Sequence, residues 1–526
     1  MTDSGSGRLL QLNINGATVE VPDRGDSLLG VLRDDLKLTG AKDGCSPQGQ
    51  CGCCTVLIDG QPRVACVTPA RRLRGRSVVT IEGLDPDRAE LWGAALCSTG
   101  GSQCGFCTPA IVLRLEATMQ DPQHVSDDDA EVEAKQALLA HLCRCTGWQT
   151  ITEAFTAVRN ETIETPVAVG EQRSERIELE GGVAQEISPR SALGAGGFAA
   201  DTAPADRLVA VPDENHMWHV AATLQEARAL AGKVQGRRTT IEPTYPIPIP
   251  DGDWVASFQT TWTDPAYLET DASWCEPGGE PATALGNGGA FGGKRDAEVE
   301  HAARRLADEH RRPVLALYSR EDVMRRTAKR PPLATGIRAD GTGVINVAAT
   351  SGVAELVTSV APEFEVREFE FAGPPTSLAP RAAVWAEIAV ARAALSDPDA
   401  PITVVSPQGG TATVSGGSDG IHVEVDAGAA LAPEVLRSYC IGAAHMGWSW
   451  ATSEALTVDL DGQIHDLTVR SLGILRAVDT PPITVSISDE ADRPGVNGSD
   501  AVFAAVAALA WRQSGFARRF PVDLNR

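Results

Sequence analysis

"GCSPQGQCGCC", residues 44–54, places four cysteines and three glycines in eleven positions. Without Cys53, the loop and the hairpin after it form a C-x5-C-x2-C-x11-C pattern from Cys45, Cys51, Cys54 and Cys66. Three ligands on one loop and a fourth near a strand end is the plan of plant-type ferredoxins. The glycines let the backbone curl so that N–H groups point at an anionic cluster. The pattern therefore favours a [2Fe–2S] cluster over structural zinc, which usually pairs two CxxC knuckles.

Two further cysteine motifs follow, GSQCGFCTPA at 101–110 and HLCRCTGW at 141–148. Two cysteines one residue apart cannot point the same way along a regular helix, so we expect the second motif at a helix end. Spacing alone leaves zinc open as the metal of this second set. Cys97 and Cys53 belong to neither pattern, and we expect both to be packed thiols.

The segments around the first loop predict a small mixed sheet. Residues 8–22 alternate apolar and polar side chains on both sides of an Asn-Gly pair, which indicates a hairpin. A helix is expected at 27–36, a second hairpin with an Asp-Gly turn at 55–67, and a last strand at 77–82.

From residue 85 the pattern changes to helices, expected at 89–98, 109–119, 126–142 and 151–159. Ser126, followed by three aspartates, is a strong helix start because acidic side chains suit the first turn. Residues 161–187 are polar and acidic and are predicted to be a linker. The remainder is a glycine-rich mixture of short strands and helices.

Composition narrows the function further. The net charge is −24 and the pI about 4.8, which disfavours a nucleic-acid partner. The longest apolar run, residues 501–511, is too short to span a bilayer, so no membrane partner is expected. Ten of the twelve cysteines precede residue 146, which indicates one metal-rich N-terminal region. The polar first twenty residues show no secretory signal, so we expect a cytoplasmic chain with reduced thiols.

Together, "GCSPQGQCGCCTVLIDG…ACV", "GSQCGFCTP" and "LCRCTGW" resemble the two-cluster iron–sulfur module of the xanthine oxidase family of molybdenum hydroxylases, over about residues 8–160. The resemblance implies one distal [2Fe–2S] cluster on Cys45, Cys51, Cys54 and Cys66. It implies a second cluster, near the molybdenum cofactor, on Cys104, Cys107, Cys143 and Cys145. It also implies that Gln103 and Cys145 lie against the pterin. The first loop has five residues between its first two cysteines where four is usual, which leaves either Cys51 or Cys53 as a ligand.

A glycine-rich turn, LGNGGAFGGK at 285–294, leads into an expected helix, strand and SRED motif. Such a turn can cradle a phosphate or an oxo group, or it can merely pack a helix close to a strand. It resembles the cofactor loop of the family's molybdopterin-binding subunit, which implies Phe291, Gly292 and Gly293 as cofactor contacts. About 340 residues is roughly half of what such a subunit needs.

This half departs from the family at two positions that carry chemistry. Where the family places a glutamine near molybdenum, residues 263–265 read Thr-Asp-Pro. Where it places a glutamate as catalytic base, residues 494–500 read PGVNGSD and contain no glutamate. The catalytic residues are therefore unknown, and Asp500 is the candidate base.

The fold class expected is α+β and multidomain: a ferredoxin-like β-grasp domain at 1–84, a helical [2Fe–2S]-binding domain at 85–160, a linker at 161–187 and a condensed molybdopterin-binding-like region at 188–526. The resemblance implies an iron–sulfur electron-transfer subunit of a molybdenum hydroxylase-type oxidoreductase. Its cofactors would be two [2Fe–2S] clusters and a molybdopterin-type cofactor. Because no convincing flavin segment is visible, molybdenum-binding and FAD-binding subunits are the expected partners, with a small-molecule substrate.

Two alternatives remain open at this point. The chain could be a self-sufficient hydroxylase that binds its own cofactor and uses Asp500 as the base. It could instead be a zinc-bearing scaffold without redox chemistry.

Overall fold

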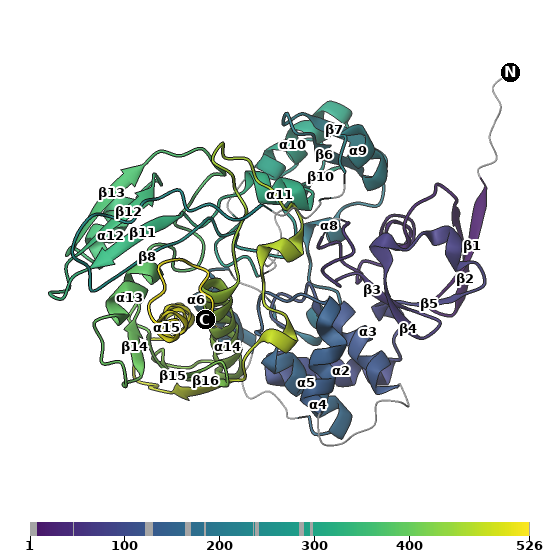
Figure 1. The fold of residues 1–526 in the computed structure, drawn as a ribbon. Coiled ribbons are helices and arrows are strands. Elements are labelled where there is room, and N and C mark those ends of the chain that lie inside the picture. The colour runs from purple at the N-terminus through teal and green to yellow at the C-terminus, as the bar shows by residue number, and fades with distance from the viewer. Residues whose placement is uncertain are drawn as a thin grey trace.

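The structure is a computed structural model that describes residues 8–45, 47–120, 130–163, 170–183, 186–234, 236, 241–282, 289–294 and 298–524. These residues form four sheets interspersed with helices, which confirms the α+β, multidomain class. Figure 1 shows the N-terminal third, in purple and blue, beside a larger teal-to-yellow region that carries the remaining sheets.

The N-terminal sheet has the strand order β2-β1-β5-β3-β4. Its strands are β1 (Leu9–Ile14), β2 (Ala17–Pro22), β3 (Thr55–Ile58), β4 (Gln61–Val64) and β5 (Ser77–Val79). Both predicted hairpins are confirmed, with left-handed backbone at Asn15-Gly16 and at Asp59-Gly60. β1 and β5 run parallel inside the sheet, and the expected last strand ends at Val79, earlier than predicted.

The helix predicted at 27–36 is present as α1 (Leu28–Gly30), which continues as the π-helix η1 (Val31–Asp35). The Ser27 hydroxyl caps it by accepting the Gly30 N–H at 3.3 Å. After the cysteine loop, β4 leads into the short 3-10 helices η2 (Ala65–Val67) and η3 (Ala70–Leu73), and β5 into η4 (Ile81–Gly83).

The second part of the chain is helical, as expected. It comprises α2 (Pro86–Thr99), α3 (Thr108–Met119), α4 (Ala130–Ala137) with η6 (Leu138–Ala140), and α5 (Gln149–Asn160). The helix start predicted at Ser126 lies outside the described residues. Glu116 ties α3 to α2, because its carboxylate accepts from Arg88 and from Trp92 Nε1 at 2.8 Å.

The segment expected to be a linker, 161–187, differs from that expectation. Its residues 170–181 form α6 (Gly170–Gly181), which packs against the C-terminal region. Arg176 and Glu180 are both fully buried and lie 3.0 Å apart. The charged side chains that suggested a solvated linker are thus satisfied by one another and by the protein backbone.

Two four-stranded sheets follow. The first, β7-β6-β10-β9, consists of β6 (Leu208–Pro212), β7 (Trp218–Ala221), β9 (Ala272–Cys275) and β10 (Val314–Leu317). The helices α8 (Ala199–Thr202), α9 (Leu224–Leu230) and α10 (Glu298–His310) pack against it, α11 (Arg320–Arg326) follows β10, and the preceding α7 (Pro189–Ala192) packs against α2. The second, β13-β12-β11-β8, consists of β8 (Ala256–Gln259), β11 (Leu333–Ile337), β12 (Gly343–Ala348) and β13 (Phe364–Phe369), with α12 (Val353–Val360) and α13 (Trp385–Ala393).

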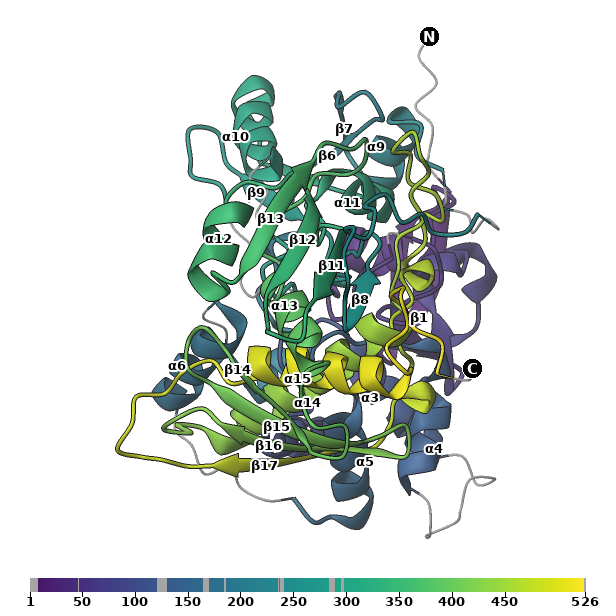
Figure 2. The ribbon, with the colours of Figure 1, turned by 60° about the vertical axis from the view of Figure 1, so that its left-hand side comes forward.

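The last sheet, β14-β15-β16-β17, is covered by two long helices. The elements are β14 (Ile402–Val405), β15 (Thr411–Gly417), β16 (Gly420–Asp426), β17 (Ile483–Ser488), α14 (Pro433–Thr452) and α15 (Ser499–Gln513), with η7 (Val469–Leu472) and η8 (Ala477–Asp479) between α14 and β17. Figure 2 shows α15 lying across this sheet. α15 is buried over most of its length, since its small alanines allow close approach on all sides. No helix in the described ranges is long and apolar enough to cross a membrane.

The C-terminal region packs onto the cysteine-bearing part. Leu456, Val458, Val469 and Leu472 belong to the same buried cluster as the N-terminal cysteines. Arg470 Nε donates to the Gln50 carbonyl at 2.9 Å. Arg320 donates to the Gly44 carbonyl and, at 2.6 Å, to the Leu268 carbonyl. The cysteine loop is therefore held from both sides by later parts of the chain.

Candidate metal centres

The first cysteine group lies between the loop at 44–54 and the end of β4, and its four thiols are buried: Cys45, Cys51, Cys54 and Cys66. The Cys45 side chain is within hydrogen-bonding distance of those of Cys51 and Cys66. Cys66 also reaches Cys54. The sulfurs thus form two pairs, Cys45 with Cys51 and Cys54 with Cys66, and the contact between Cys45 and Cys66 joins the pairs.

Backbone amides point at these sulfurs, as the glycine pattern predicts. The Gln48 N–H donates to Cys45 Sγ at 3.1 Å, and the Cys66 N–H donates to Cys54 Sγ at 3.4 Å. Gly49 and Gly52 have φ values of 70° and 77°, which other residues rarely adopt. Donors of this kind stabilise the negative charge of a thiolate-bound cluster.

The second group is formed by the loop before α3 and the loop before α5. The Cys104 and Cys145 sulfurs lie 3.5 Å apart, and Cys107 is hydrogen-bonded to Cys143. Each group thus contains two pairs of neighbouring sulfurs. Two pairs suit a [2Fe–2S] cluster, in which four thiolates serve two irons.

Hydrogen bonds between neighbouring thiols shift the pKa of Cys143 and of Cys45 downward. The pKa of Cys143 is lowered to about 6, chiefly by the hydrogen bond from Cys107, whose own pKa is raised. Likewise, hydrogen bonds from Cys51 and Cys66 lower the pKa of Cys45. Ligation replaces thiol protons by metal, so such preformed thiolate sites favour metal uptake.

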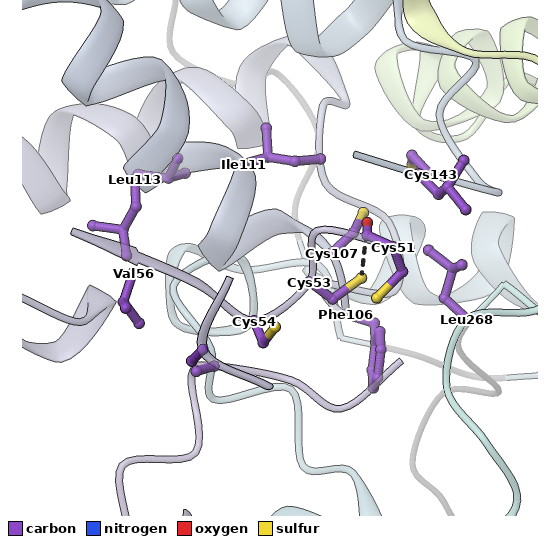
Figure 3. Packing of buried hydrophobic residues seen from close by; sticks show 14 of the residues in the cluster. Cys51, Cys53, Cys54, Val56, Phe106, Cys107, Ile111, Leu113, Cys143 and Leu268 are labelled. Carbon is purple, nitrogen blue, oxygen red and sulfur yellow. Dashed lines mark hydrogen bonds between the residues drawn. The ribbon is translucent and has the colours of Figure 1, made fainter. Parts of the chain in front are cut away.

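The two groups are joined through a few contacts. The Leu142 N–H, next to Cys143, donates to the Cys51 carbonyl at 3.0 Å. The His141 ring lies against Gly52, where a Cβ would come within 2.7 Å of it. Burial lowers the pKa of His141 to about 3, so this imidazole is neutral and rests against Thr55 Oγ1 at 3.2 Å. Figure 3 shows Cys51, Cys53, Cys54, Cys107 and Cys143 gathered at this junction.

The second cysteine loop is also fixed to the C-terminal region. Arg144 forms a buried two-pronged ion pair with Glu454, at 2.5 and 3.0 Å, and donates to the Pro265 carbonyl. Gly442, in α14, lies so close to the Cys145 carbonyl that any Cβ there would overlap it. The loop and α14 thus meet backbone to backbone.

The residues implied as pterin contacts lie around one small cavity of about 20 Å³. Gln103, Cys145, Gly289, Phe291 and Tyr439 line it. Gln103 Nε2 donates to the Cys145 carbonyl at 3.1 Å and to Ser438 Oγ at 2.9 Å. A Cβ at Gly289 would overlap the Cys145 sulfur, so the glycine turn and the second cysteine loop are in direct contact.

A larger cavity of about 700 Å³ adjoins it and shares Phe291. This volume is within the usual range for sites that take a small molecule or cofactor. Gly292 and Asp500 also line it, whereas Gly293 does not. Burial raises the pKa of Asp500, although Arg381, whose Nε lies 3.0 Å from its carboxylate, opposes the shift. A carboxyl with a raised pKa at a cavity wall suits proton transfer.

Asp264, in the segment where the family has a glutamine, forms an ion pair. Asp264 Oδ2 lies 2.9 Å from Lys329 Nζ, and both side chains are buried. The 700 Å³ cavity beside Phe291 has room for a cofactor. At residues 263–265, however, the chain presents an ion-paired carboxylate in place of an amide.

The structure adds site residues that the sequence analysis missed. Arg381 stacks on the Phe291 ring at 4.2 Å and lines the 700 Å³ cavity. Glu180 accepts the Gly498 and Ser499 amides at 3.1 and 2.9 Å, at the start of α15. Arg144 stands inside the LCRCTGW motif and could have been singled out as the charged residue between two ligands. No sequence pattern around Arg381 or Glu180 indicates their role.

Comparisons with known proteins show which family the cysteine-bearing part resembles. The family model of a [2Fe-2S] binding domain matches residues 80–156. A probable xanthine dehydrogenase subunit of Bacillus subtilis (strain 168) is 37% identical over 152 residues, which are 29% of this chain and 85% of that protein. The nicotinate dehydrogenase small FeS subunit of Eubacterium barkeri is 36% identical over 141 residues, which are 26% of this chain and 87% of that protein.

The fold also resembles a solved structure over nearly all of the chain. The aldehyde oxidoreductase from Desulfovibrio desulfuricans ATCC 27774 superposes with a TM-score of 0.70, covering 95% of this chain and 97% of that one. Sequence identity in this superposition is 13%, so the similarity is one of fold. It extends well past the cysteine-bearing part into the region at 188–526.

Proposed function

This chain belongs to the xanthine oxidase family of molybdenum hydroxylases, and we propose that it is the family's iron–sulfur electron-transfer component with two [2Fe–2S] clusters. It is an oxidoreductase, like the relatives it matches. The observation that carries the proposal is the pairing of eight buried cysteines in two separate groups, each with sulfur pairs suited to two irons. The same observation disfavours the zinc scaffold.

The eight cysteines would hold the two clusters, which would supply one-electron transfer, and a molybdopterin-type cofactor, when bound, would supply the substrate oxidation. Cys145 and Gln103 face the cavity beside Phe291 and would meet that cofactor. At the other end, Val67 is 51% exposed and follows Cys66 directly. The chain's own residues thus define a path from an internal cavity, through the second and then the first cysteine group, to the surface.

A self-sufficient hydroxylase is the second candidate, because the 700 Å³ cavity lies in this chain and carries Asp500. In that case Asp500 would hold or move a proton at its carboxylate, with Arg381 fixing its orientation. Against this, the Arg381 ion pair engages the carboxylate, and Asp264 offers no amide where the family has one. These departures favour a chain that works together with a complete molybdenum subunit.

The proposal includes the partner subunits, the cellular compartment and the substrate class. The relatives' names describe subunits of dehydrogenases, and we assign this chain a molybdenum-binding and an FAD-binding partner subunit. The cytoplasm suits eight cluster-bound thiols because its thiols stay reduced. We assign a small-molecule substrate, because the 700 Å³ cavity has the size usual for small-molecule sites.

The experiment is to express the chain in a host that makes the cofactor and to measure molybdenum content and dye-reduction activity. The isolated chain should hold little molybdenum and reduce dye only when a complete molybdenum subunit is added. The matched variant Asp500→Asn should then behave like the unaltered chain. Near-stoichiometric molybdenum, with activity that Asp500→Asn abolishes, would establish the self-sufficient enzyme instead.

A further inference from the structure

Cys53 is the one thiol at the junction of the two groups that neither group uses. It is 1% exposed and lies between the ligand positions Cys51 and Cys54 in the loop. Its backbone is fixed, because its carbonyl accepts the Lys42 N–H at 3.0 Å. The side chain is therefore held in place in the space between the two groups.

The Cys53 sulfur has neighbours on both sides. It donates to the Cys51 carbonyl at 3.8 Å, the contact drawn dashed in Figure 3, and the same view shows the Cys51 and Cys53 side chains next to each other, close enough for the two thiols to interact. Cys107 and Cys143, of the second group, lie within electrostatic reach. Contact by hydrogen bonding is thus made to the first group alone.

The Cys53 thiol has one proton to donate and two acceptors near it. The Cys51 carbonyl already accepts the Leu142 N–H at 3.0 Å. When Cys51 binds iron its sulfur is negatively charged, and hydrogen bonds to charged acceptors are about twice as strong as neutral ones. The thiol proton will therefore turn from the carbonyl to the sulfur once a cluster is bound.

We propose that the Cys53 thiol is a positioning residue that donates a hydrogen bond to the Cys51 ligand sulfur and thereby raises the reduction potential of the distal cluster. This inference rests on the proposed assignment of Cys51 as a ligand. A donated hydrogen bond withdraws negative charge from the cluster, and the reduced cluster, which carries one more electron, benefits most. The near cluster receives no such bond from Cys53, so its potential changes less.

A higher distal potential has a direct consequence for electron flow. Electrons that leave the second group for the first move downhill when the first has the higher potential. Cys53 thus biases transfer toward the surface near Val67 without taking part in ligation.

The test is an electron paramagnetic resonance redox titration of the full chain with both clusters, comparing the unaltered protein with Cys53→Ala and Cys53→Ser. Cys97→Ala is the matched control, because Cys97 is a buried thiol that belongs to neither group. A Cys66→Ser variant identifies the distal signal by removing it. Both cluster signals should persist in all Cys53 and Cys97 variants.

Removing the donor should lower the distal midpoint potential. The donated hydrogen bond strengthens as the cluster gains an electron, and we expect its loss to change the reduced-to-oxidised ratio at fixed potential by up to about tenfold. That corresponds to about 59 mV for a one-electron couple. Cys53→Ser keeps a donor and should retain most of the original potential, while Cys97→Ala should change neither cluster.

Each contrary result has a distinct meaning. Two signals with an unshifted distal potential in Cys53→Ala would overturn this inference and leave the proposed function standing. Loss of the distal signal in that variant would also overturn it, because Cys53 would then be a ligand. Absence of both signals from the unaltered chain would overturn the proposed function and, with it, this inference.

Discussion

The buried ion pair between Arg144 and Glu454 joins the second cysteine loop to the C-terminal region, and its removal should separate the two. The Arg144 guanidinium is 7% exposed and the Glu454 carboxylate 1%. Glu454→Leu would leave a buried cation whose remaining partner among the described residues is the Pro265 carbonyl. An uncompensated buried charge of this kind costs about 3–5 kcal/mol.

The double variant distinguishes this cause from a general loss of packing. Replacing both partners by apolar side chains, in Arg144→Met with Glu454→Leu, removes both desolvated charges and is often neutral. We therefore expect the free energy of unfolding of the double variant to lie within about 1 kcal/mol of that of the unaltered protein. The coupling energy between Arg144 and Glu454 would then be about 3 kcal/mol or more.

The assay is denaturant unfolding followed by tryptophan fluorescence, together with the resonance signal of the near cluster. The single variants should broaden or lose that signal, because Arg144 stands between Cys143 and Cys145. As a control, Asp479→Leu breaks an exposed pair with Arg476 and should cost less than about 1 kcal/mol. A cost for Glu454→Leu as small as that of the control would refute the reasoning.

Three further results are expected. Gly442→Ala should destabilise the protein by several kcal/mol (about 3 or more), since its Cβ would overlap the Cys145 carbonyl, whereas Gly170→Ala, which meets nothing, should be neutral in the same unfolding assay. Burial lowers the pKa of His445 to about 4. In the unfolded chain His445 is protonated below about pH 6.5, whereas in the folded chain it stays neutral down to about pH 4. The free energy of unfolding should therefore fall as the pH drops from 6.5 to 4, by about 2.5 kcal/mol at pH 4.5, and His445→Leu should remove this loss. Cys104→Ser should abolish one cluster signal and leave the other; loss of both would show that the two groups do not fold independently.

The sequence predicted those features that depend on neighbours along the chain. The hairpins at Asn15-Gly16 and Asp59-Gly60 follow from residues that adopt a left-handed backbone, and three of the helices of the second part follow from their periodicity. The cysteine spacings predict the two ligand sets, and in the structure the Cys45 side chain lies next to those of Cys51 and Cys66.

Other features depend on contacts between distant segments and left no local signal. Residues 161–187 look like a solvated linker, yet Arg176 and Glu180 form a buried pair whose partners lie in the last hundred residues. The approach of Gly442 to Cys145 depends on how α14 packs, which periodicity does not reveal. Gln103 and Phe291, each named as a cofactor contact only through the family resemblance, line the same small cavity.

The central claim is that this chain holds two [2Fe–2S] clusters, and it is tested by analysing iron, sulfide and zinc in the purified chain and recording the spectrum after dithionite reduction. The account predicts about four irons and four inorganic sulfides per chain, with two distinct [2Fe–2S] resonance signals from inequivalent sites. Stoichiometric zinc without such signals would contradict it.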